Sequence, residues 1–306
     1  MDRNLDNNKP LISVIINCYN GEKYLRETID SVLNQSYQNW EIIFWDNSST
    51  DQSANILKSY KEDRIKYFYS DKHAQLYDAR NQAYEMSRGD FVCFLDTDDY
   101  FLNNYFEKQL KLFNDKDVGF SCSNHFYKDE AKNKFWIRFK KRQSVGYILS
   151  DLLKNYNVSL STLFIKRSAL SKSKKLFDSS YTYLGDFDFV INLSASLKMA
   201  RSHEPLSVYR LHDNNLSIKN HLVQLQELEN WHNKSKKVKK IVNDKNFSNI
   251  KNLIIYKKII IALHEKKSLI AILLLKKVPW SFRKFKYIVI LILHFVFRLK
   301  LKNFRL

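Results

Sequence analysis

The sequence predicts an α/β fold, in which a mostly parallel β-sheet is flanked by helices and followed by a basic helical region. In the first half of the 306 residues, short runs of β-branched and aromatic residues alternate with segments of helical periodicity. Strands separated by single helices form parallel sheets through right-handed crossovers. The 5 glycines and 3 prolines are too few for a loop-rich all-β fold.

The elements of the first half follow from their apolar patterns. Residues 11–17 (LISVIIN) form a β-branched run, as expected of a strand buried on both faces. The next helix is predicted from four apolar residues that share one helical face, Leu25, Ile29, Val32 and Leu33. Further strands are predicted at 41–45, 65–69 and 91–95, with a helix at 78–86.

The second half is less regular. We expect strands near 118–122 and 161–165, a helix near 186–199, and helices over the remaining residues. Two domains are predicted: an α/β domain at 1–217, and a basic helical region at 218–306.

The positive charge is concentrated in the C-terminal part. The formal net charge is +19. Residues 231–306 contain 20 Lys and Arg against two acidic residues, a net of +18, which leaves +1 for residues 1–230. A near-neutral body with a basic tail suggests one catalytic or binding domain and one attachment region. Binding of nucleic acid is not predicted, because the basic residues alternate with aliphatic ones and form no stacking pattern.

Cysteines and the N-terminus bear on the compartment. Cys18, Cys93 and Cys122 match neither a disulfide framework nor a metal site, so we expect buried, reduced thiols. The first residues (MDRNLDNNKP) lack an apolar signal segment, and no run reaches the roughly 20 apolar residues of a membrane-spanning helix. The predicted location is cytoplasmic, peripheral on the inner face of the cell membrane.

Carboxylates follow two of the predicted strands directly. Asp46 follows the second strand, and Asp96, Asp98 and Asp99 follow the strand at 91–95. In open α/β sheets, ligands bind beyond the carboxyl ends of the strands. Asp96 and Asp98 are two residues apart, so their side chains point to the same side of an extended backbone. Converging carboxylates suit Mg²⁺ or Mn²⁺ together with phosphate oxygens, although an isolated Asp-x-Asp can also be a solvated loop or a helix cap.

Four segments, in this order, resemble family 2 glycosyltransferases. They are LISVIINCYNGEKYLRETIDSVLNQSYQNWEIIFWDNSSTDQS, LYDARNQAYEMSRGDFVCFLDTDDYF, YLGDFDFVINLS and EPLSVYRLHDNNLS, and the resemblance runs from about residue 10 to 217. It implies an inverting enzyme with the GT-A fold, a Rossmann-like sheet with a metal-binding Asp-x-Asp. The implied donor is a nucleotide-sugar, with UDP favoured, and the implied cofactor is Mn²⁺ or Mg²⁺.

The resemblance also implies a role for individual residues at the donor end of the site. Asp46 would bind the nucleobase in a pocket with Tyr19 and Asn20. Asp96 would face the ribose and the metal, and Asp98 would be the principal metal ligand.

The remaining roles concern catalysis and the phosphates. Asp186 would be the general base, with Asp188 as the next candidate. Arg80 would support the nucleotide site, and Arg210 and His212 would reach the diphosphate or the metal. For Arg80, Asp188 and His212, an ordinary structural or surface role is the alternative.

Three positions depart from the family pattern. Many relatives have Pro where this chain has Asn17, and Gly where it has Gln75. The acidic motif often reads Glu-Asp, whereas Gly185 precedes Asp186 here, so the choice between Asp186 and Asp188 as the base stays open.

The tail favours a membrane surface as partner. Residues 268–275 (SLIAILLL) and 287–297 (YIVILILHFVF) are apolar runs bracketed by Lys and Arg. Basic, aliphatic helices of this length lie in the interface of anionic membranes. The alternative is a helical subdomain or a dimer interface. An acceptor that is a saccharide or lipid-linked saccharide of the bacterial cell envelope would fit a membrane-lying tail.

Two further functions stay in play. A sugar nucleotidyltransferase would carry a Gly-rich phosphate loop after the first strand, and NCYNGEKYL does not supply one. A catalytically inactive protein with this fold could bind membranes or polyanions, but it would have no need of Asp46, Asp98 and Asp186.

Overall fold

The computed structural model describes residues 9–170, 176–216, 219–280 and 282–297. The chain forms two compact units. The first comprises Met1–Ile148 and Asn157–His212, and the second comprises Leu149–Tyr156 and Asp213–Leu306. The predicted domain boundary between residues 217 and 218 lies outside the described residues.

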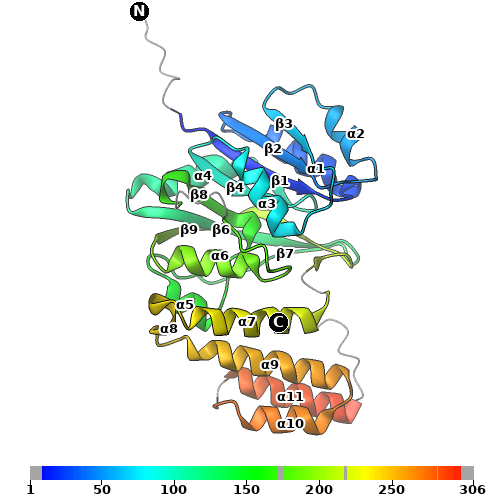
Figure 1. Ribbon diagram of the computed structural model, residues 1–306, viewed down its shortest axis with the longest axis vertical. Helices are drawn as coiled ribbons and strands as arrows, with labels where there is room; N and C mark the ends of the chain where they lie inside the picture. Colours follow the sequence, from blue (N-terminus) through cyan, green and yellow to red (C-terminus); the bar gives the residue numbers. More distant parts are fainter. Residues whose placement is uncertain (1–8, 171–175, 217–218, 281, 298–306) are drawn as a thin grey trace, which may run out of the picture. The chain divides into compact units, whose positions relative to one another are not determined.

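A nine-stranded sheet forms the centre of the first unit (Figure 1). Its strands are β1 (Ile12–Cys18), β2 (Trp40–Asp46), β3 (Ile65–Tyr69), β4 (Phe91–Phe94), β5 (Tyr100–Phe101), β6 (Val118–Asp129), β7 (Lys134–Ile137), β8 (Leu163–Lys166) and β9 (Lys198–Leu211). Their order is β3-β2-β1-β4-β8-β6-β9-β5, and β7 pairs with β6. The four N-terminal strands are all parallel, as predicted, and the second half adds antiparallel pairs.

Helices cover both faces of the parallel half. They are α1 (Glu22–Leu33), α2 (Ser53–Lys58) and α3 (Leu76–Glu85). Leu25, Ile29 and Val32 of α1 pack into one core cluster with alternate residues of β1 and β2, which confirms the predicted apolar face. The connection through α3 returns the chain past β1 to β4, so the strand order reverses between β1 and β4. In α/β sheets this reversal point is where ligands bind.

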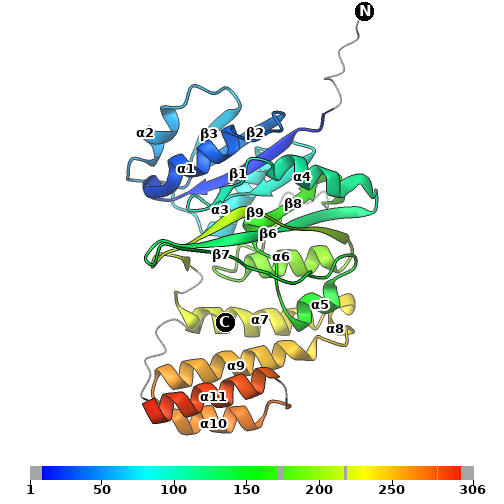
Figure 2. The ribbon, with the colours of Figure 1, turned by 180° about the vertical axis from the view of Figure 1, so that it is seen from behind.

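The second half of the first unit is built on the long pair β6 and β9, which lie side by side in both views (Figures 1 and 2). Its helices are α4 (Tyr105–Lys111) and α6 (Gly185–Ser194). The helix predicted near 186–199 ends earlier than expected, because residues from Lys198 onward pair with β6. The strand predicted at 161–165 begins with a 3₁₀ turn, Leu160–Thr162, before β8.

The second unit is helical, as the sequence predicted for its residues from 219 onward. It contains α5 (Leu149–Lys154), α7 (His221–Ser235), α8 (Lys239–Val242), α9 (Ser248–His264), α10 (Ser268–Lys276) and α11 (Phe282–Phe297). A core of its own joins α9, α10 and α11. Among the helices that the structure describes, none combines the length and the apolar character that crossing a membrane requires.

The three cysteines are free and buried, as predicted. Burial raises the pKa of each thiol. A thiol with a raised pKa in an apolar surrounding is unreactive, so the cysteines belong to the core and not to the site.

Candidate active site

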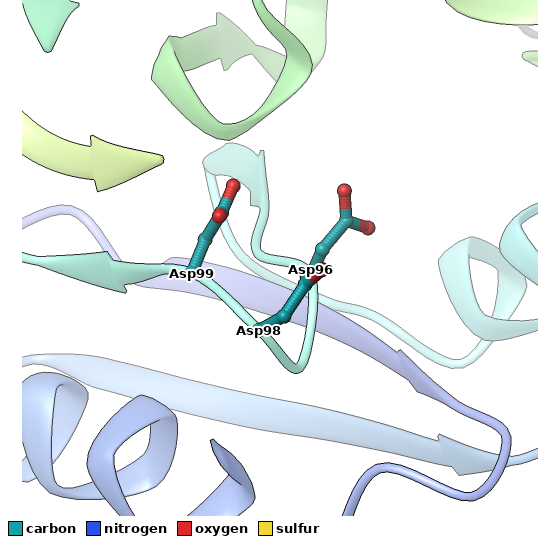
Figure 3. A group of neighbouring side chains, drawn as sticks. All are labelled: Asp96, Asp98 and Asp99. Carbon is teal, nitrogen blue, oxygen red and sulfur yellow. The ribbon is translucent and has the colours of Figure 1, made fainter. Parts of the chain in front are cut away.

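The acidic loop, residues 96–99, lies beyond the end of β4 at the reversal of the strand order (Figure 3). Asp96, Asp98 and Asp99 each offer a carboxylate oxygen within 4.8 Å of the others. The sequence predicted Asp96 and Asp98 as metal ligands; the structure adds Asp99. Three converging carboxylates repel one another, and this repulsion is relieved when a cation lies between them.

Side chains from two distant elements hold the acidic loop in place. The Thr28 hydroxyl of α1 donates to the carbonyl oxygens of Thr97 (2.9 Å) and Asp99 (2.8 Å). From β9, Nε of Arg210 donates to the carbonyl oxygen of Asp98 (2.8 Å). These three hydrogen bonds fix the loop through its main-chain carbonyl oxygens.

Asp99 supports the assignment of a cation site. The residue is 1% exposed, and its Oδ1 accepts from the backbone N–H of Arg210 (3.0 Å). Its Oδ2 is buried and accepts no hydrogen bond of ordinary geometry in the described part of the chain, although the Ser161 hydroxyl beside this carboxylate lowers its pKa. Burial raises the pKa of Asp99 well above its usual value, and Asp98 and Asp96 raise it further. A buried carboxylate oxygen beside two more carboxylates fits Mg²⁺ or Mn²⁺, which take oxygen ligands.

Arg80 joins the acidic loop to the predicted base. Its side chain, on α3, is 4% exposed and pairs with Asp96 (2.6 Å) and with Asp186 (2.9 Å). Burial lowers the pKa of Arg80, but the two carboxylates raise it by more, so the guanidinium stays charged. One planar cation with a carboxylate on each arm fixes the spacing of the two acids.

Gly185 explains how Asp186 reaches Arg80. A Cβ atom at Gly185 would lie 2.6 Å from the ring of Tyr77, so only glycine lets the first turn of α6 approach α3 this closely. Burial raises the pKa of Asp186, while Arg80 lowers it. Asp188, the other predicted base, accepts a hydrogen bond from Asn192 one turn along α6 (3.0 Å). The structure thus brings Asp186 to the acidic loop through Arg80, a contact that Asp188 does not make.

The residues predicted to bind the nucleobase lie at the ends of β1 and β2. Asp46 is fully buried, and its two oxygens accept from the Tyr67 hydroxyl and the Ser49 N–H, each at 2.8 Å. Burial and Asp46 raise the pKa of Tyr67, so its hydroxyl stays a donor. Asn20 Oδ1 accepts from the N–H of Thr50 (2.8 Å), which ties the loop after β1 to the loop after β2.

An exposed aromatic surface lies beside these residues. The rings of Tyr19 and His73 pack against each other with centroids 4.1 Å apart. Nδ1 of His73 also lies 3.1 Å from the backbone carbonyl oxygen of Asn47. The ring of Tyr19 remains 54% exposed, as a surface for stacking a nucleobase must be.

Arg210 and His212 reach the acidic loop from the end of β9. His212 Nε2 lies 2.9 Å from Asp98 Oδ2. The Arg210 side chain is 2% exposed and pairs with both Glu27 and Glu130. Lys128 lies 3.8 Å and 3.3 Å from the same two glutamates. We name Arg210, Lys128, Glu27 and Glu130 the Arg210 cluster.

The residues that the structure adds to the predicted site include Asp99 as a candidate ligand, His73, Glu27 and Glu130. Asp99 was visible in the Asp-Thr-Asp-Asp run, but the spacing rule for an extended strand selects only alternate residues. The loop turns after Asp96, where the N–H of Asp99 donates back to the Asp96 carbonyl oxygen (3.1 Å). The other three carry no local signal, because their partners are far away in the sequence.

An α/β unit with an acidic metal-type loop at the reversal of its strand order is the architecture of the GT-A glycosyltransferases. Residues 13–173, more than half of the chain, match the family described as Glycosyl transferase family 2. The chain belongs to this family, and the resemblance stated from its sequence motifs is confirmed.

Two curated relatives are similar to much of the chain. A putative teichuronic acid biosynthesis glycosyltransferase, TuaG, from Bacillus subtilis is 34% identical over 53% of this chain and 65% of the relative. The Escherichia coli protein WfaP, a UDP-Glc:alpha-D-GlcNAc-diphosphoundecaprenol beta-1,3-glucosyltransferase, is 29% identical over 68% of this chain and 80% of its own length. The chain thus spans less than two thirds of TuaG.

Among solved structures, a mannosyltransferase from Pyrobaculum calidifontis in complex with GDP-Man and Mn²⁺ has a TM-score of 0.63. The similarity covers 93% of this chain and 80% of that one, at 13% sequence identity. It therefore supports the fold, and the predicted GT-A class of a mostly parallel sheet flanked by helices is confirmed.

Proposed function

We propose that this chain is a metal-dependent, inverting glycosyltransferase that moves a sugar from a nucleotide-sugar to an acceptor. The donor is a UDP-sugar, and the acceptor is a saccharide or lipid-linked saccharide in the synthesis of a cell-envelope polysaccharide. The observation that carries the proposal is the double ion pair of Arg80, which joins Asp96 of the acidic loop to Asp186. It holds a donor-side carboxylate and a base candidate at a fixed spacing, as a displacement between two substrates requires.

Asp186 has the role of general base in this reaction. The acceptor hydroxyl oxygen attacks the anomeric carbon while the bond from that carbon to the diphosphate oxygen breaks, which inverts the configuration. The hydroxyl proton passes to Asp186, and the electron pair of the broken bond leaves with the nucleoside diphosphate. Burial, which raises the pKa of Asp186, makes it a better proton acceptor than an ordinary aspartate.

The donor site comprises the acidic loop and the residues at the ends of β1 and β2. Asp98 and Asp96, with Asp99 beside them, would hold a Mn²⁺ or Mg²⁺ ion that neutralises charge on the leaving diphosphate. Tyr19 offers its exposed ring to the base, with Asn20 and Asp46 beneath it. His212, beside Asp98, would reach the metal or the diphosphate, while Arg210, paired with Glu27 and Glu130, holds the loop in place.

The relatives support the choice of substrates. The name of WfaP includes UDP-Glc and a diphosphoundecaprenol-linked sugar, and the name of TuaG includes teichuronic acid biosynthesis. The diphosphoundecaprenol-linked sugar in the name of WfaP belongs to the class of lipid-linked acceptor proposed here. The Mn²⁺ complex of the Pyrobaculum calidifontis enzyme supports the cation.

Binding of UDP, GDP and dTDP by calorimetry, with and without Mn²⁺, tests the donor site. We expect UDP to bind, more tightly with Mn²⁺, and Asp98→Asn to abolish the effect of the cation. If none of the three nucleotides bound under either condition, the proposal would be wrong and a non-catalytic protein with this fold would take its place.

A pair of matched variants tests the base. Asp186→Asn should retain UDP binding but lower turnover of UDP-sugar by about 10²–10⁴-fold, the usual contribution of a general base. Asp188→Asn, two residues further along the same helix turn, is the control and should retain turnover. The reverse result would assign the base to Asp188. Product stereochemistry, read by NMR of the new linkage, decides between inversion and retention.

A further inference from the structure

Helix α10 is apolar on all sides but is covered on only one. Ala271 and Leu275 point into the core shared with α9 and α11. On the outer side, Leu269 is 78% exposed and Leu273 is 58% exposed, with Ile270 and Ile272 also exposed. A helix that is apolar all round is normally buried in a protein core or in lipid. We name these four outer residues the α10 surface.

An aromatic residue extends the exposed apolar area past the end of α10. Trp280 follows the helix and is 75% exposed, more than any other tryptophan of the described residues. Tryptophan is enriched where an apolar phase meets water, because its ring is large and apolar and its N–H needs a polar partner. Scattered apolar side chains are normal on a protein surface, but consecutive leucines and isoleucines beside an exposed tryptophan mark an interaction site.

Basic residues bracket the α10 surface. Lys266 and Lys267 precede α10, Lys276 and Lys277 end and follow it, and all four are exposed. Lys267 pairs with Glu265 (2.7 Å). From residue 266 to the end of the sequence there are eleven Lys and Arg and no Asp or Glu. The partner of this surface must therefore be both apolar and anionic.

We propose that the α10 surface inserts its leucines and isoleucines into the interface of an anionic membrane, with Trp280 at the headgroup level and the bracketing lysines on lipid headgroups. The apolar area and the positive charge occur together, as in helices that lie on membranes. A second copy of the chain fits this surface poorly, because each copy would bring the same uncompensated lysines to the contact. The proposal rests on α10 and its charges, and not on the donor site.

Co-sedimentation of the full chain with lipid vesicles tests the proposal. Vesicles of equal parts phosphatidylglycerol and phosphatidylcholine should bind the protein, and pure phosphatidylcholine vesicles should bind it far less. Leu269→Ser with Leu273→Ser should lower partitioning at least tenfold. The matched control is Leu222→Ser on α7, which is 57% exposed in the same unit and should leave partitioning unchanged.

The charges are tested in the same way. Lys276→Glu with Lys277→Glu should weaken binding by about fivefold or more per position at low salt. Lys239→Glu with Lys240→Glu, two exposed lysines of α8, makes the same change in net charge and should weaken binding less. Quenching of tryptophan fluorescence by spin-labelled lipid should be largely lost in Trp280→Phe.

Three outcomes would overturn the proposal. The wild-type protein could ignore anionic vesicles, or the serine variant could bind them as well as the Leu222→Ser control does. Alternatively, the wild-type protein could be a dimer in sedimentation without lipid, and the serine variant a monomer, which would assign the surface to a second copy. Calorimetry with UDP on the same variants reports on the donor site separately, so failure of either proposal can be told from failure of the other.

Discussion

Replacing Gly185 by alanine tests whether the close approach of α6 to α3 sets the position of Asp186. The added Cβ would stand 2.6 Å from the Tyr77 ring, whereas ordinary contact begins at 3.4 Å. The helix start or the ring must therefore move by about 0.8 Å (3.4 − 2.6). Overpacking of this kind lowers stability by about 1–3 kcal/mol. A shift approaching 1 Å at a catalytic group lowers turnover by about a hundredfold.

The assay is release of UDP from the UDP-sugar that the binding experiment identifies, together with thermal unfolding. Gly185→Ala should lower kcat about a hundredfold while UDP and Mn²⁺ still bind, because the acidic loop belongs to other elements. Gly119→Ala is the control, since its Cβ would press on Leu197 at 3.0 Å, away from the loop, and should affect stability alone.

A second substitution makes the prediction sharper. Tyr77→Leu removes the ring that the new Cβ meets, so alanine at Gly185 should cost less in a Tyr77→Leu background than in the wild type. The two changes should therefore couple in a double-mutant cycle. If Gly185→Ala behaved like Gly119→Ala, with an unchanged kcat, Asp186 would not depend on this contact and its role as base would lose its structural support.

Three further predictions concern other residues. His125 is 1% exposed, neither ring nitrogen has a partner among the described residues, and burial lowers its pKa from 6.5 to about 3. As pH falls, His125 takes up a proton in the unfolded chain before it does so in the folded one, so this contribution to stability is fully present above pH 6.5 and is lost towards pH 3. The loss is about 2.7 kcal/mol at about pH 4.5. Urea unfolding of His125→Leu should not show this loss. Arg210→Lys should weaken Mn²⁺ binding about 10–100-fold in a titration with UDP present; an equal loss of UDP affinity without Mn²⁺ would instead put Arg210 on the diphosphate. Tyr19→Ala should weaken UDP binding by about 1–3 kcal/mol in calorimetry, if its exposed ring stacks on the base.

The parallel half of the sheet could be predicted from the sequence because each of its elements has a local signal. The strand predicted at 41–45 is β2 (Trp40–Asp46), and the strand predicted at 65–69 is β3 with the same bounds. Short runs of β-branched and aromatic residues favour strands, and these two runs contain both kinds. Because the ends of these strands could be predicted, the positions of the carboxylates that directly follow them could be predicted as well.

The second half could not be predicted in this way. The strand β9 pairs with β6, and the pairing shifts register at three places along β6, so neither strand shows a clean alternation over its full length. Arg210, near its end, has partners 80 and 183 residues away in Glu130 and Glu27. A pairing over such distances leaves no periodic trace in a single sequence, so the Arg210 cluster appears only once β9 lies beside β6.

The charges around the acidic loop separate into a balanced group and an unbalanced one. In the Arg210 cluster, two cations face two glutamates, so the cluster is neutral by itself. Asp96, Asp98 and Asp186 pair with Arg80 and His212, and burial raises the pKa of the neighbouring Asp99. Arg210 therefore adds little net charge to the loop and acts on it through main-chain hydrogen bonds. The excess negative charge is thus confined to the aspartates, where a divalent cation gains the most Coulomb energy and where the diphosphate of a donor would need that cation in order to approach.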